Sequence, residues 1–506
     1  MIHGDWLAKW SMVDPDKVAF VDLAAEEEIS YGALNARADR AANMLRTQFG
    51  VGLGQRVAVL GANRMEQVAL FFAVAKLGAI LVPVNWRLAA EEVAWVLGDS
   101  TPEVLFFGAD LGGTALALAG GLWSGAMVGF DDEAEDGYAE RLARSEDKPQ
   151  ACQELNADSP LMLLYTSGTT GRPKGAVLTH GSITWNAINT DCGWDLRGDD
   201  VTVAHAPLFH TGGWNVLTLP LIHRGATVLL ARKFDASETL RAIEKYKVTV
   251  LFAVPTMFQM MLERPEFGQT DLSSMRFFIS GGAPCPISLI EAYAAFGLTF
   301  KQGYGLTEVG PNCFVLHERD AIRKAGSVGF PVLHLDTRLV EVDGQPVGPG
   351  EVGELQLKGP TVCAGYWNNL EDTAKALDED GWFATGDLFR IDEQGYHHVV
   401  GRLKEMYISG GENVYPAEVE RVLYQLPEIV EAAVIGKADE KWGEVGYAFV
   451  AFDPACQDKL SEEVILAHCR KQLAKYKVPK GLQIMESLPK GPSGKILKKA
   501  LWAANP

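Results

Sequence analysis

One short segment of the chain combines the residue types that can hold a phosphate group. In LMLLYTSGTTGRPKG, residues 161–175, an apolar run leads into hydroxyl residues, glycines and two cations, Arg172 and Lys174. Glycines allow backbone N–H groups to approach a phosphate closely, hydroxyls donate further hydrogen bonds, and the cations balance negative charge. The segment does not match the G-x-x-x-x-G-K-[ST] pattern of the Walker loop. We therefore predict a phosphate-binding loop of another kind, rather than a surface turn of small residues.

A second glycine-rich stretch predicts only a turn. Gly348, Gly350 and Gly353 match the G-x-G-x-x-G pattern of dinucleotide-binding loops. In such loops the glycines lead into a helix, but here Pro349 interrupts them and the strand-like ELQLKG follows. We therefore expect a hairpin turn between two strands at this position.

The overall composition argues against several classes of protein. The chain of 506 residues has a formal net charge of −19, so its surface as a whole repels polyanions and no nucleic-acid partner is expected. Its seven cysteines are scattered without a C-x-x-C pair, which argues against a disulfide framework or a zinc site. The first residues, MIHGDWLAKW, do not resemble a signal peptide. Together these features predict a cytoplasmic protein.

The longest apolar stretch, residues 68–84, is interrupted by Lys76, Gly78 and Pro83. We interpret it as a buried helix followed by a strand, because it is too short and too interrupted to span a membrane. Peripheral contact with a membrane stays open, as does the oligomeric state, with a homodimer among the options.

The segments that must position the phosphate loop follow an alternating pattern over the first three hundred residues. Short β-rich runs such as RVAVLGAN (56–63) and VTVLFAV (248–254) are each followed by a segment with helical patterning. This order predicts layered α/β units with largely parallel sheets. After about Gly326, short strands around Gly/Pro turns predict an antiparallel β subdomain, and after about residue 401 the pattern becomes α+β. A chain of this length is expected to form two or more domains.

Six motifs, in order along the chain, resemble those of the adenylate-forming superfamily, which includes acyl-CoA synthetases, luciferases and peptide-synthetase adenylation domains. YTSGTTGRPKG resembles its phosphate loop, QGYGLTE its adenine and magnesium segment, and ATGDLFRID its ribose segment. GRLKE resembles the hinge, SGGENVYPAEVE the acyl-CoA synthetase signature and PKGPSGK the C-terminal lysine motif. The resemblance implies a ligase that activates a carboxylic acid with ATP and Mg²⁺ and transfers the acyl group to coenzyme A.

The resemblance also implies how the chain divides. A large N-terminal adenylation domain of layered α/β sheets, with an antiparallel β subdomain, would span residues 1–400. A hinge would span residues 401–405, and a small mobile α+β C-terminal domain would span residues 406–506. The small domain would rotate about Lys404 between two half-reactions.

Within these motifs, the resemblance implies a set of residues that hold the nucleotide. Tyr304 would stack on adenine, Asp387 would accept hydrogen bonds from the ribose hydroxyls, and Arg402 would reach ribose or phosphate. Glu308 would bind Mg²⁺, a hard cation that prefers carboxylate and phosphate oxygens, with Thr166 as a second ligand. The further nucleotide-binding positions are Ser167, Gly168, Thr169, Thr170, Gly171, Lys174, Gly282, Ala283, Thr307 and Lys495.

The first of the two implied steps needs no protein nucleophile. A substrate carboxylate, with a pKa of about 4–5, is ionised at neutral pH and can attack the α-phosphate itself. Because an anion must approach a polyanion, Lys495 and Glu308 would act as catalytic residues by positioning and by stabilising charge. In the second step rotation would remove Lys495, and Ser409, Gly410 and Gly411 would line a tunnel for the thiol of CoA.

The sequence gives weaker evidence for the identity of the acid than for the nucleotide. HAPLFHTGGW, residues 205–214, resembles the segment between the acyl pocket and the ATP site, so His210 would lie near the reacting carboxylate as a third catalytic residue. Trp214 has the spacing of a tryptophan that gates the acyl tunnel in long-chain fatty-acyl-CoA synthetases, but it could equally pack in the core. ISGGAP, KAGSVG and ISGGENVYPAEVE most resemble bacterial fatty-acyl-CoA ligases, which favours a medium- to long-chain fatty acid.

Several alternatives stay open. Feruloyl-type aromatic-acid ligases share much of the same sequence, and the acyl group could pass to a carrier protein instead of CoA. A luciferase-type oxygenase shares the adenylation half of the chemistry. A non-catalytic ATP-binding protein would be expected to have lost Glu308, Asp387 or Lys495, and all three are present.

Overall fold

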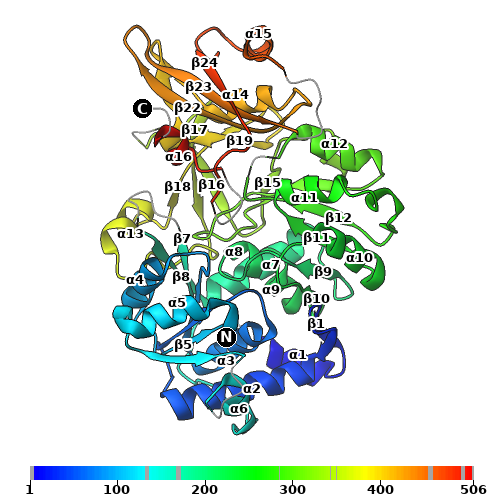
Figure 1. The fold of residues 1–506 in the computed structure, drawn as a ribbon, viewed down its shortest axis with the longest axis vertical. Coiled ribbons are helices and arrows are strands. Elements are labelled where there is room, and N and C mark those ends of the chain that lie inside the picture. The colour runs from blue at the N-terminus through cyan, green and yellow to red at the C-terminus, as the bar shows by residue number, and fades with distance from the viewer. Residues whose placement is uncertain are drawn as a thin grey trace.

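The chain forms several sheets, of which the last two in the sequence are each built from consecutive strands, whereas the first strands of the chain join strands that come after residue 200 (Figure 1). The computed structural model describes residues 5–131, 136–166, 172–283, 285–341, 344–348, 350–453, 460–491 and 496–503. The N-terminal sheets are parallel and flanked by helices, the central ones are antiparallel, and a final sheet ends the chain. This confirms the predicted combination of α/β layers, an antiparallel β part and a C-terminal α+β part.

The first sheet carries the phosphate-loop segment at one edge. Its strand order is β6–β5–β3–β4–β7–β8, and its neighbours are parallel except for β7 and β8. The apolar stretch predicted as helix and strand forms α3 and β4, which are almost entirely buried. The strands are β3 (Arg56–Leu60), β4 (Ile80–Val84), β5 (Val104–Phe107), β6 (Ala126–Gly129), β7 (Pro160–Thr166) and β8 (Lys174–Thr179). The helices are α1 (Leu7–Val13), α2 (Tyr31–Phe49), α3 (Met65–Leu77), α4 (Ala90–Ser100), α5 (Gly112–Ala117) and α6 (Tyr138–Ala143), with the turns η1 (Ala109–Leu111) and η2 (Leu118–Leu122).

Two further sheets, β2–β1–β10–β9 and β11–β12–β13, follow, and their neighbours are parallel except for β1 and β2. Their strands are β1 (Val18–Asp22), β2 (Glu27–Ser30), β9 (Val201–Ala204), β10 (Thr227–Leu230), β11 (Val250–Ala253), β12 (Phe277–Ser280) and β13 (Phe300–Gln302). The helices of this part are α7 (His180–Trp194), α8 (Thr211–Trp214), α9 (Thr218–His223), α10 (Ala236–Tyr246), α11 (Pro255–Leu262) and α12 (Ile287–Ala295), with the turn η3 (Phe267–Gln269).

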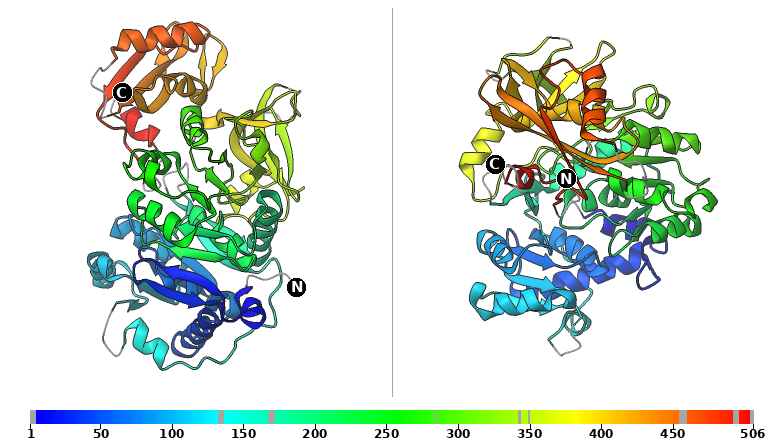
Figure 2. Two further views of the ribbon diagram at one scale, coloured as in Figure 1. Left: turned by 90° about the vertical axis from the view of Figure 1, so that its right-hand side faces the viewer. Right: turned by 45° about the horizontal axis from the view of Figure 1, so that its top comes forward.

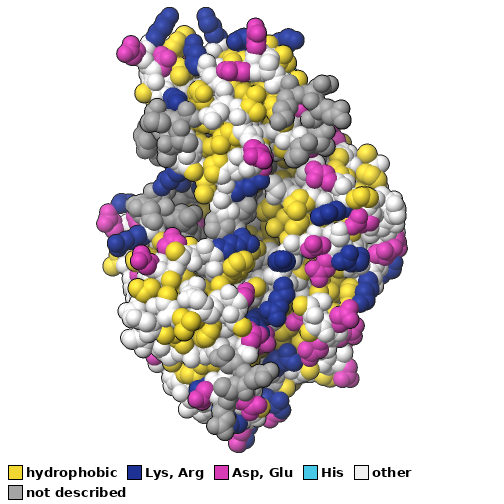
Figure 3. Space-filling view, in the orientation of Figure 1, with side chains coloured by type: hydrophobic (Ala, Val, Ile, Leu, Met, Phe, Trp, Pro, Cys, Tyr) yellow, Lys and Arg dark blue, Asp and Glu magenta, His cyan; other side chains and the backbone are white. Residues whose placement is uncertain are grey.

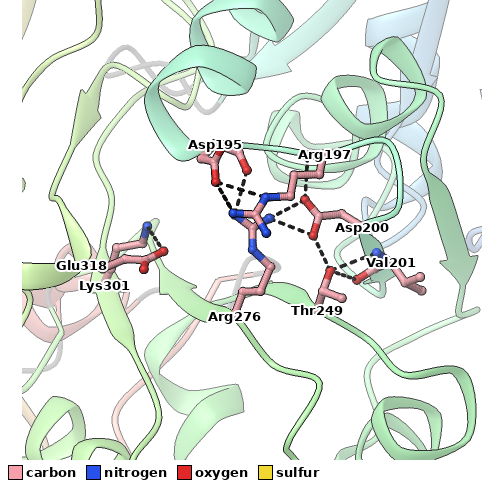
Figure 4. Close-up of polar contacts among 8 residues, drawn as sticks. All are labelled: Asp195, Arg197, Asp200, Val201, Thr249, Arg276, Lys301 and Glu318. Carbon is pink, nitrogen blue, oxygen red and sulfur yellow. Dashed lines mark hydrogen bonds and ion pairs between the residues drawn. The ribbon is translucent and has the colours of Figure 1, made fainter.

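A half-buried arginine, Arg276, joins these two sheets to the end of α7 (Figure 4). Arg276, just before β12, donates from Nη1 to both carboxylate oxygens of Asp200 at 2.9 and 2.7 Å and from Nη2 to the carbonyl of Asp195 at 2.8 Å. Thr249 donates to Asp200 at 2.7 Å and accepts from the N–H of Val201 at 3.0 Å, so the start of β9 is tied to the residue before β11. Hydrogen bonds between charged groups are shorter and stronger than neutral ones, so this network holds the three segments together.

The predicted antiparallel part is a four-stranded sheet in the order β16–β17–β18–β19. Gly350 precedes β17 with φ +82°, in the left-handed region that favours glycine, as the predicted hairpin turn requires. The strands are β14 (Phe314–Val315), β15 (Phe330–Pro331), β16 (Asp336–Val340), β17 (Val352–Lys358), β18 (Phe383–Ile391) and β19 (His397–Arg402), with α13 (Leu370–Ala376), η4 (Glu318–Asp320) and η5 (Leu403–Glu405).

The last sheet is built only from strands between Tyr407 and Met485, and Figure 2 shows this part, orange to red, as a cap beyond the other sheets. Pro416 begins α14, where the missing N–H of proline costs no helical hydrogen bond, and the helix ends at Leu423. Ser461 caps α15 by accepting from the N–H of Val464. The elements are β20 (Tyr407–Ser409), β21 (Glu412–Val414), α14 (Pro416–Leu423), β22 (Ile429–Asp439), β23 (Gly443–Phe452), α15 (Glu462–Gln472), β24 (Gly481–Met485) and α16 (Lys498–Ala503).

The surface in Figure 3 carries Lys/Arg and Asp/Glu side chains interspersed with hydrophobic ones. Among the helices of the described residues, none is long and apolar enough to cross a membrane.

Candidate active site

A buried carboxylate lies where the phosphate-loop strand approaches the loop after β13. Glu308 is 8% exposed, and its Oε1 accepts hydrogen bonds from the hydroxyl of Thr166, the last residue of β7, at 3.4 Å and from the hydroxyl of Tyr366 at 3.1 Å. Burial raises the pKa of Glu308, while the hydrogen bonds from Tyr366 and Thr166 act in the opposite direction. The two residues predicted to bind Mg²⁺, Glu308 and Thr166, are therefore neighbours.

The oxygen donors at this place fit Mg²⁺ when a nucleotide supplies the remaining ligands. The part of the chain that the structure describes has no cluster of three or more histidine, cysteine, aspartate or glutamate side chains that could hold a metal ion alone. Mg²⁺ is commonly bound by one or two carboxylates together with substrate phosphates and water. A single buried carboxylate beside a hydroxyl matches that pattern.

A second carboxylate is held by two of the residues predicted to bind the nucleoside. The hydroxyl of Tyr304 donates to Oδ2 of Asp387 at 2.6 Å, and Nε of Arg402 lies 2.9 Å from Oδ1. Asp387 on β18 pairs directly with Arg402 on β19, so the strand register brings the ion pair together. Burial and the charge of Asp387 raise the pKa of Tyr304 well above its ordinary value, so its hydroxyl stays protonated and donates.

A turn and an edge-to-face contact place Tyr304 and the predicted backbone positions beside one another. The ring of Tyr304 packs against Phe389 of β18 at 4.8 Å between centroids. Gly282, in the turn after β12, has φ +80°, and Ala283 follows it. The N–H of Gly303 donates to the carbonyl of Ser280 at 2.7 Å, so the ends of β12 and β13 lie side by side.

Lys174 begins β8 and makes two contacts that sequence reasoning did not predict. Its Nζ lies 2.7 Å from Oδ2 of Asp372 in α13 and 5.3 Å from the centre of the Tyr366 ring. The hydrogen bond from Lys174 lowers the pKa of Asp372. Neither Asp372 nor Tyr366 belongs to a motif used above, and no local spacing identifies them, because their partners are distant in the chain.

Several predicted residues lie outside the described residues. They are Ser167, Gly168, Thr169, Thr170, Gly171 and Lys495. In the sequence, residues 167–171 stand between β7 and β8, which pair from Pro160 opposite Thr179 to Thr166 opposite Lys174.

The residues predicted for the acid lie around α8. His210 precedes the helix and packs on Phe209 with 4.5 Å between ring centroids. Trp214 is 1% exposed, stacks on Phe71 at 5.1 Å and donates its indole N–H to the carbonyl of Leu208. This packing fits the core interpretation of Trp214, and its role as a gate stays a prediction.

Two cavities adjoin the same helix. One is lined by Phe252, Gly212, Gly213 and apolar neighbours from β9. The other is lined mainly by polar residues, among them Thr211, Asn215, Thr307 and Thr361. Among the described residues, neither Oδ1 of Asn215 nor Oγ1 of Thr361 has a hydrogen-bond partner.

The residues predicted for domain rotation and for CoA lie close together in the sequence, in η5 and at the end of β20. Lys404 lies in η5, and burial lowers the pKa of its ammonium group. Ser409 ends β20, and Gly410 and Gly411 follow with φ +62° and +88°. A Cβ on Gly410 would lie 2.6 Å from the ring of Trp442, so the close approach requires glycine.

Comparison with known proteins places these features in one family. Residues 7–367 match the family model "AMP-binding enzyme", and residues 418–495 match "AMP-binding enzyme C-terminal domain". The chain is 42% identical to a feruloyl-CoA synthase of Amycolatopsis, over 98% of this chain and 97% of that one. It is 40% identical to the long-chain-fatty-acid–CoA ligase FadD13 of Mycobacterium tuberculosis, over the same shares of both chains.

Solved structures share the whole fold. ATP-bound MatB from Rhodopseudomonas palustris is 31% identical, with a TM-score of 0.91 and 99% of each chain covered. MenE from Bacillus subtilis in complex with ATP and magnesium ion is 30% identical, with a TM-score of 0.85 and 98% and 99% of the two chains covered.

Proposed function

Because the chain belongs to the AMP-binding enzyme family and is an AMP-forming acid–CoA ligase, we propose that its acid is aromatic and that the predicted site residues carry the reaction. ATP with Mg²⁺ and CoA are its co-substrates. The acid carboxylate attacks the α-phosphorus of ATP, pyrophosphate leaves, and the CoA thiol then displaces AMP from the acyl-adenylate.

The proposed nucleotide site combines the two carboxylates described above. Glu308 and Thr166 hold Mg²⁺, which neutralises phosphate charge as the acid approaches. Asp387 and Arg402 hold the ribose, and Tyr304 packs along the adenine ring. The hydroxyl of Tyr304 is occupied by Asp387 at 2.6 Å, which supports this assignment because the ring is then held in a single orientation.

The proposal for the remaining steps uses residues outside this cluster. Lys495 stabilises the charge that develops at the α-phosphate, and His210 lies beside the reacting carboxylate. Rotation about Lys404, within the hinge 401–405, then brings the turn of Ser409, Gly410 and Gly411 to the thiol. The positive φ of both glycines and the contact of Gly410 with Trp442 support a backbone-lined passage.

The observation that carries the choice of acid is the position of Phe252. A Cβ on Gly212 and a Cβ on Gly281 would each lie 3.3 Å from its ring, so glycine backbone faces the ring from the His210 side and from the Gly281–Ala283 turn. Because glycines have no side chains, the Phe252 ring and the backbone beside it form a flat surface. Aromatic rings prefer stacked or edge-to-face partners, so this surface suits an aromatic acid. The unpaired oxygens of Asn215 and Thr361 further suit an acid with a hydroxyl group.

A medium- to long-chain fatty acid is the second candidate. It is favoured by the 40% identity to FadD13, which is close to the 42% identity to the feruloyl-CoA synthase. If Trp214 gates a chain-length tunnel, Trp214→Ala should change the length preference. If Trp214 is only core, that variant should lose about 3–5 kcal/mol of stability with the preference unchanged.

An acid panel separates the two candidates. Cinnamate, 4-hydroxycinnamate, octanoate and hexadecanoate are each supplied with ATP, Mg²⁺ and CoA, and release of AMP and acyl-CoA is followed. We expect kcat/KM for the aromatic acids to exceed that for the fatty acids by at least about tenfold. Preference for a fatty acid would overturn the choice of acid and leave the ligase chemistry intact.

A further inference from the structure

Tyr366 touches two residues of the proposed nucleotide site, although it lies in none of the six motifs. Its hydroxyl donates to Oε1 of Glu308 at 3.1 Å, and Nζ of Lys174 lies 5.3 Å from the centre of its ring. The same Nζ is paired with Asp372 at 2.7 Å, so the ammonium group lies between a carboxylate and an aromatic ring. One side chain therefore contacts both the carboxylate proposed for Mg²⁺ and the lysine proposed for phosphate.

The backbone that carries Tyr366 is held against β8. The N–H of Ala364 donates to Val177, the N–H of Val177 donates to Gly365, and the N–H of Trp367 donates to Gly175, at 3.0, 2.9 and 2.8 Å. The N–H of Tyr366 itself donates to Oγ1 of Thr373 at 2.9 Å. The ring is thus presented by a segment that is hydrogen-bonded on both sides.

The close approach of this segment depends on one glycine. Gly365 has φ +113°, and a Cβ there would lie 2.5 Å from the methyl group of Thr373. Only glycine fits both the conformation and the space. The sequence is therefore locally adapted to bring Tyr366 into this place.

Glu308 is also held by the same segment through its backbone. The N–H of Cys363 donates to the carbonyl of Glu308 at 2.7 Å, while Tyr366, three residues later, donates to its side chain. The side chain of Cys363 is buried. Thr361, two residues earlier, lines the polar cavity together with Thr307. Both ends of the glutamate are fixed by one short stretch of chain.

We propose that Tyr366 is a positioning residue that orients Glu308 for the metal of MgATP through its hydroxyl and holds Lys174 toward the phosphates through its ring. The proposal rests on the nucleotide site proposed above. Groups that hydrogen-bond a metal-binding side chain commonly contribute about 10- to 100-fold to metal affinity or activity. A lysine over an aromatic face gains further attraction, which keeps its ammonium group in one place.

The test compares two tyrosine-to-phenylalanine variants in the full chain. Tyr366→Phe removes only the hydroxyl that reaches Glu308. Tyr396→Phe is the matched control, because the hydroxyl of Tyr396, which lies in none of the six motifs, donates to the carboxylate of Asp320 at 2.7 Å instead. Mn²⁺ is titrated into each protein with a non-hydrolysable ATP analogue, and bound metal is followed by its electron paramagnetic resonance signal.

We expect Tyr366→Phe to weaken Mn²⁺ binding in this ternary complex by about 10- to 100-fold and the control to bind like wild type. In acid-dependent pyrophosphate exchange, Tyr366→Phe should need more Mg²⁺ for half-maximal rate but recover its rate at saturating Mg²⁺. Tyr366→Leu, which also lacks the ring, should in addition raise KM for ATP at saturating Mg²⁺. If Tyr366 were only structural, both substitutions would lower thermal stability. They would not separate the Mg²⁺ requirement from the KM for ATP.

Two results would overturn the inference. One is wild-type Mn²⁺ affinity in folded Tyr366→Phe, and the other is an equal loss in Tyr396→Phe. Failure of the proposed function would look different, because wild-type protein would then form no adenylate with Mg²⁺ and any acid of the panel.

Discussion

At the scale of single residues, Asp387 links the strand register to nucleotide binding. Its carboxylate receives the Tyr304 hydroxyl on one oxygen and the Arg402 guanidinium on the other, and it is 5% exposed. A buried carboxylate with both oxygens occupied cannot rotate freely, so its orientation is set before a ligand arrives. The remaining lone pairs can then accept from a ligand hydroxyl without reorganising the site.

Replacing Asp387 by asparagine should weaken ATP binding more than folding. The amide keeps the shape but cannot accept from Arg402 and ribose as an anion, and hydrogen bonds to charged groups contribute about 1.5–3 kcal/mol. We expect KM for ATP to rise about 10- to 100-fold, with pyrophosphate exchange as the measurement. An unchanged KM for ATP would remove Asp387 from the nucleotide site.

The buried His205 should make the folded state sensitive to acid. Burial lowers its pKa from 6.5 to about 4, so the native state keeps the ring neutral while the unfolded chain takes up a proton below pH 6.5. The stability is therefore complete above pH 6.5 and falls as the pH drops toward 4, by as much as about 3 kcal/mol. Urea unfolding at pH 7 and pH 4.5 measures this difference.

The matched variant for this effect is His205→Phe, which keeps an aromatic ring against Phe234. Its unfolding free energy should depend less on pH than that of wild type, whatever its value at pH 7. If both proteins lost the same stability between the two pH values, another group would be responsible.

The sequence motifs indicated which residues lie close together where a motif includes each partner, while the roles of these residues stay predictions. Thr166 with Glu308 and Asp387 with Arg402 come from recognised motifs, and the structure brings each pair together. Tyr366 was missed because its contact with Glu308 spans 58 residues. The residues around a tyrosine do not show whether its hydroxyl donates to a carboxylate far away in the sequence.

At the scale of elements, patterning predicted the helices and strands better than their pairing. The run 68–84 was predictable because burial on all sides makes it almost continuously apolar, and α10 because burial of one face imposes a helical periodicity on its sequence. The antiparallel entry of β8 beside β7 was not predicted, since the glycine-rich motif extends into the first residues of that strand. Which strands pair depends on how distant segments of the chain come together, and local composition does not encode that arrangement.

The turn η5 is the element expected to control the second half-reaction. Lys404 lies in a 3₁₀ turn, whose φ of about −50 to −70° proline can also adopt, so Lys404→Pro should fold in the present arrangement. Rotation needs other dihedral angles, which proline restricts. We expect adenylate formation to survive and acyl-CoA formation to fall, measured separately by pyrophosphate exchange and by thioester release.

Lys495→Ala should instead impair adenylate formation and spare thioester formation. Loss of one charge at a developing oxyanion commonly costs about 10²–10³ in rate, so adenylate formation should fall by that factor. Preformed acyl-adenylate with CoA should restore thioester formation. Equal damage to both half-reactions in either variant would contradict the assignment of that residue to one step.

At the scale of the whole molecule, the hydrophobic cores divide the chain near residues 401–405, the predicted hinge. The large clusters of the sheets before β20 draw their buried members from Trp6 to Phe389. The two C-terminal clusters draw theirs from Tyr407 to Leu501. Contacts across the division include the guanidinium of Arg421 in α14 donating to the carbonyl of Val399 in β19 at 3.5 Å. Separate cores joined by a short connection favour two domains that can move relative to one another.

If residues 401–405 are a hinge between two domains, fragments 1–400 and 406–506 should each fold alone. Each should unfold in one cooperative thermal transition, because each retains a complete buried cluster. Fragment 1–400 should bind MgATP more weakly than the full chain, since Arg402 is lost, and the two fragments mixed should form little acyl-CoA. As a control, division after residue 440 separates β22 from β23, the longest antiparallel pairing of the C-terminal sheet, and its C-terminal fragment should not fold. Cooperative unfolding of that control fragment, or its absence in 406–506, would place the domain boundary elsewhere.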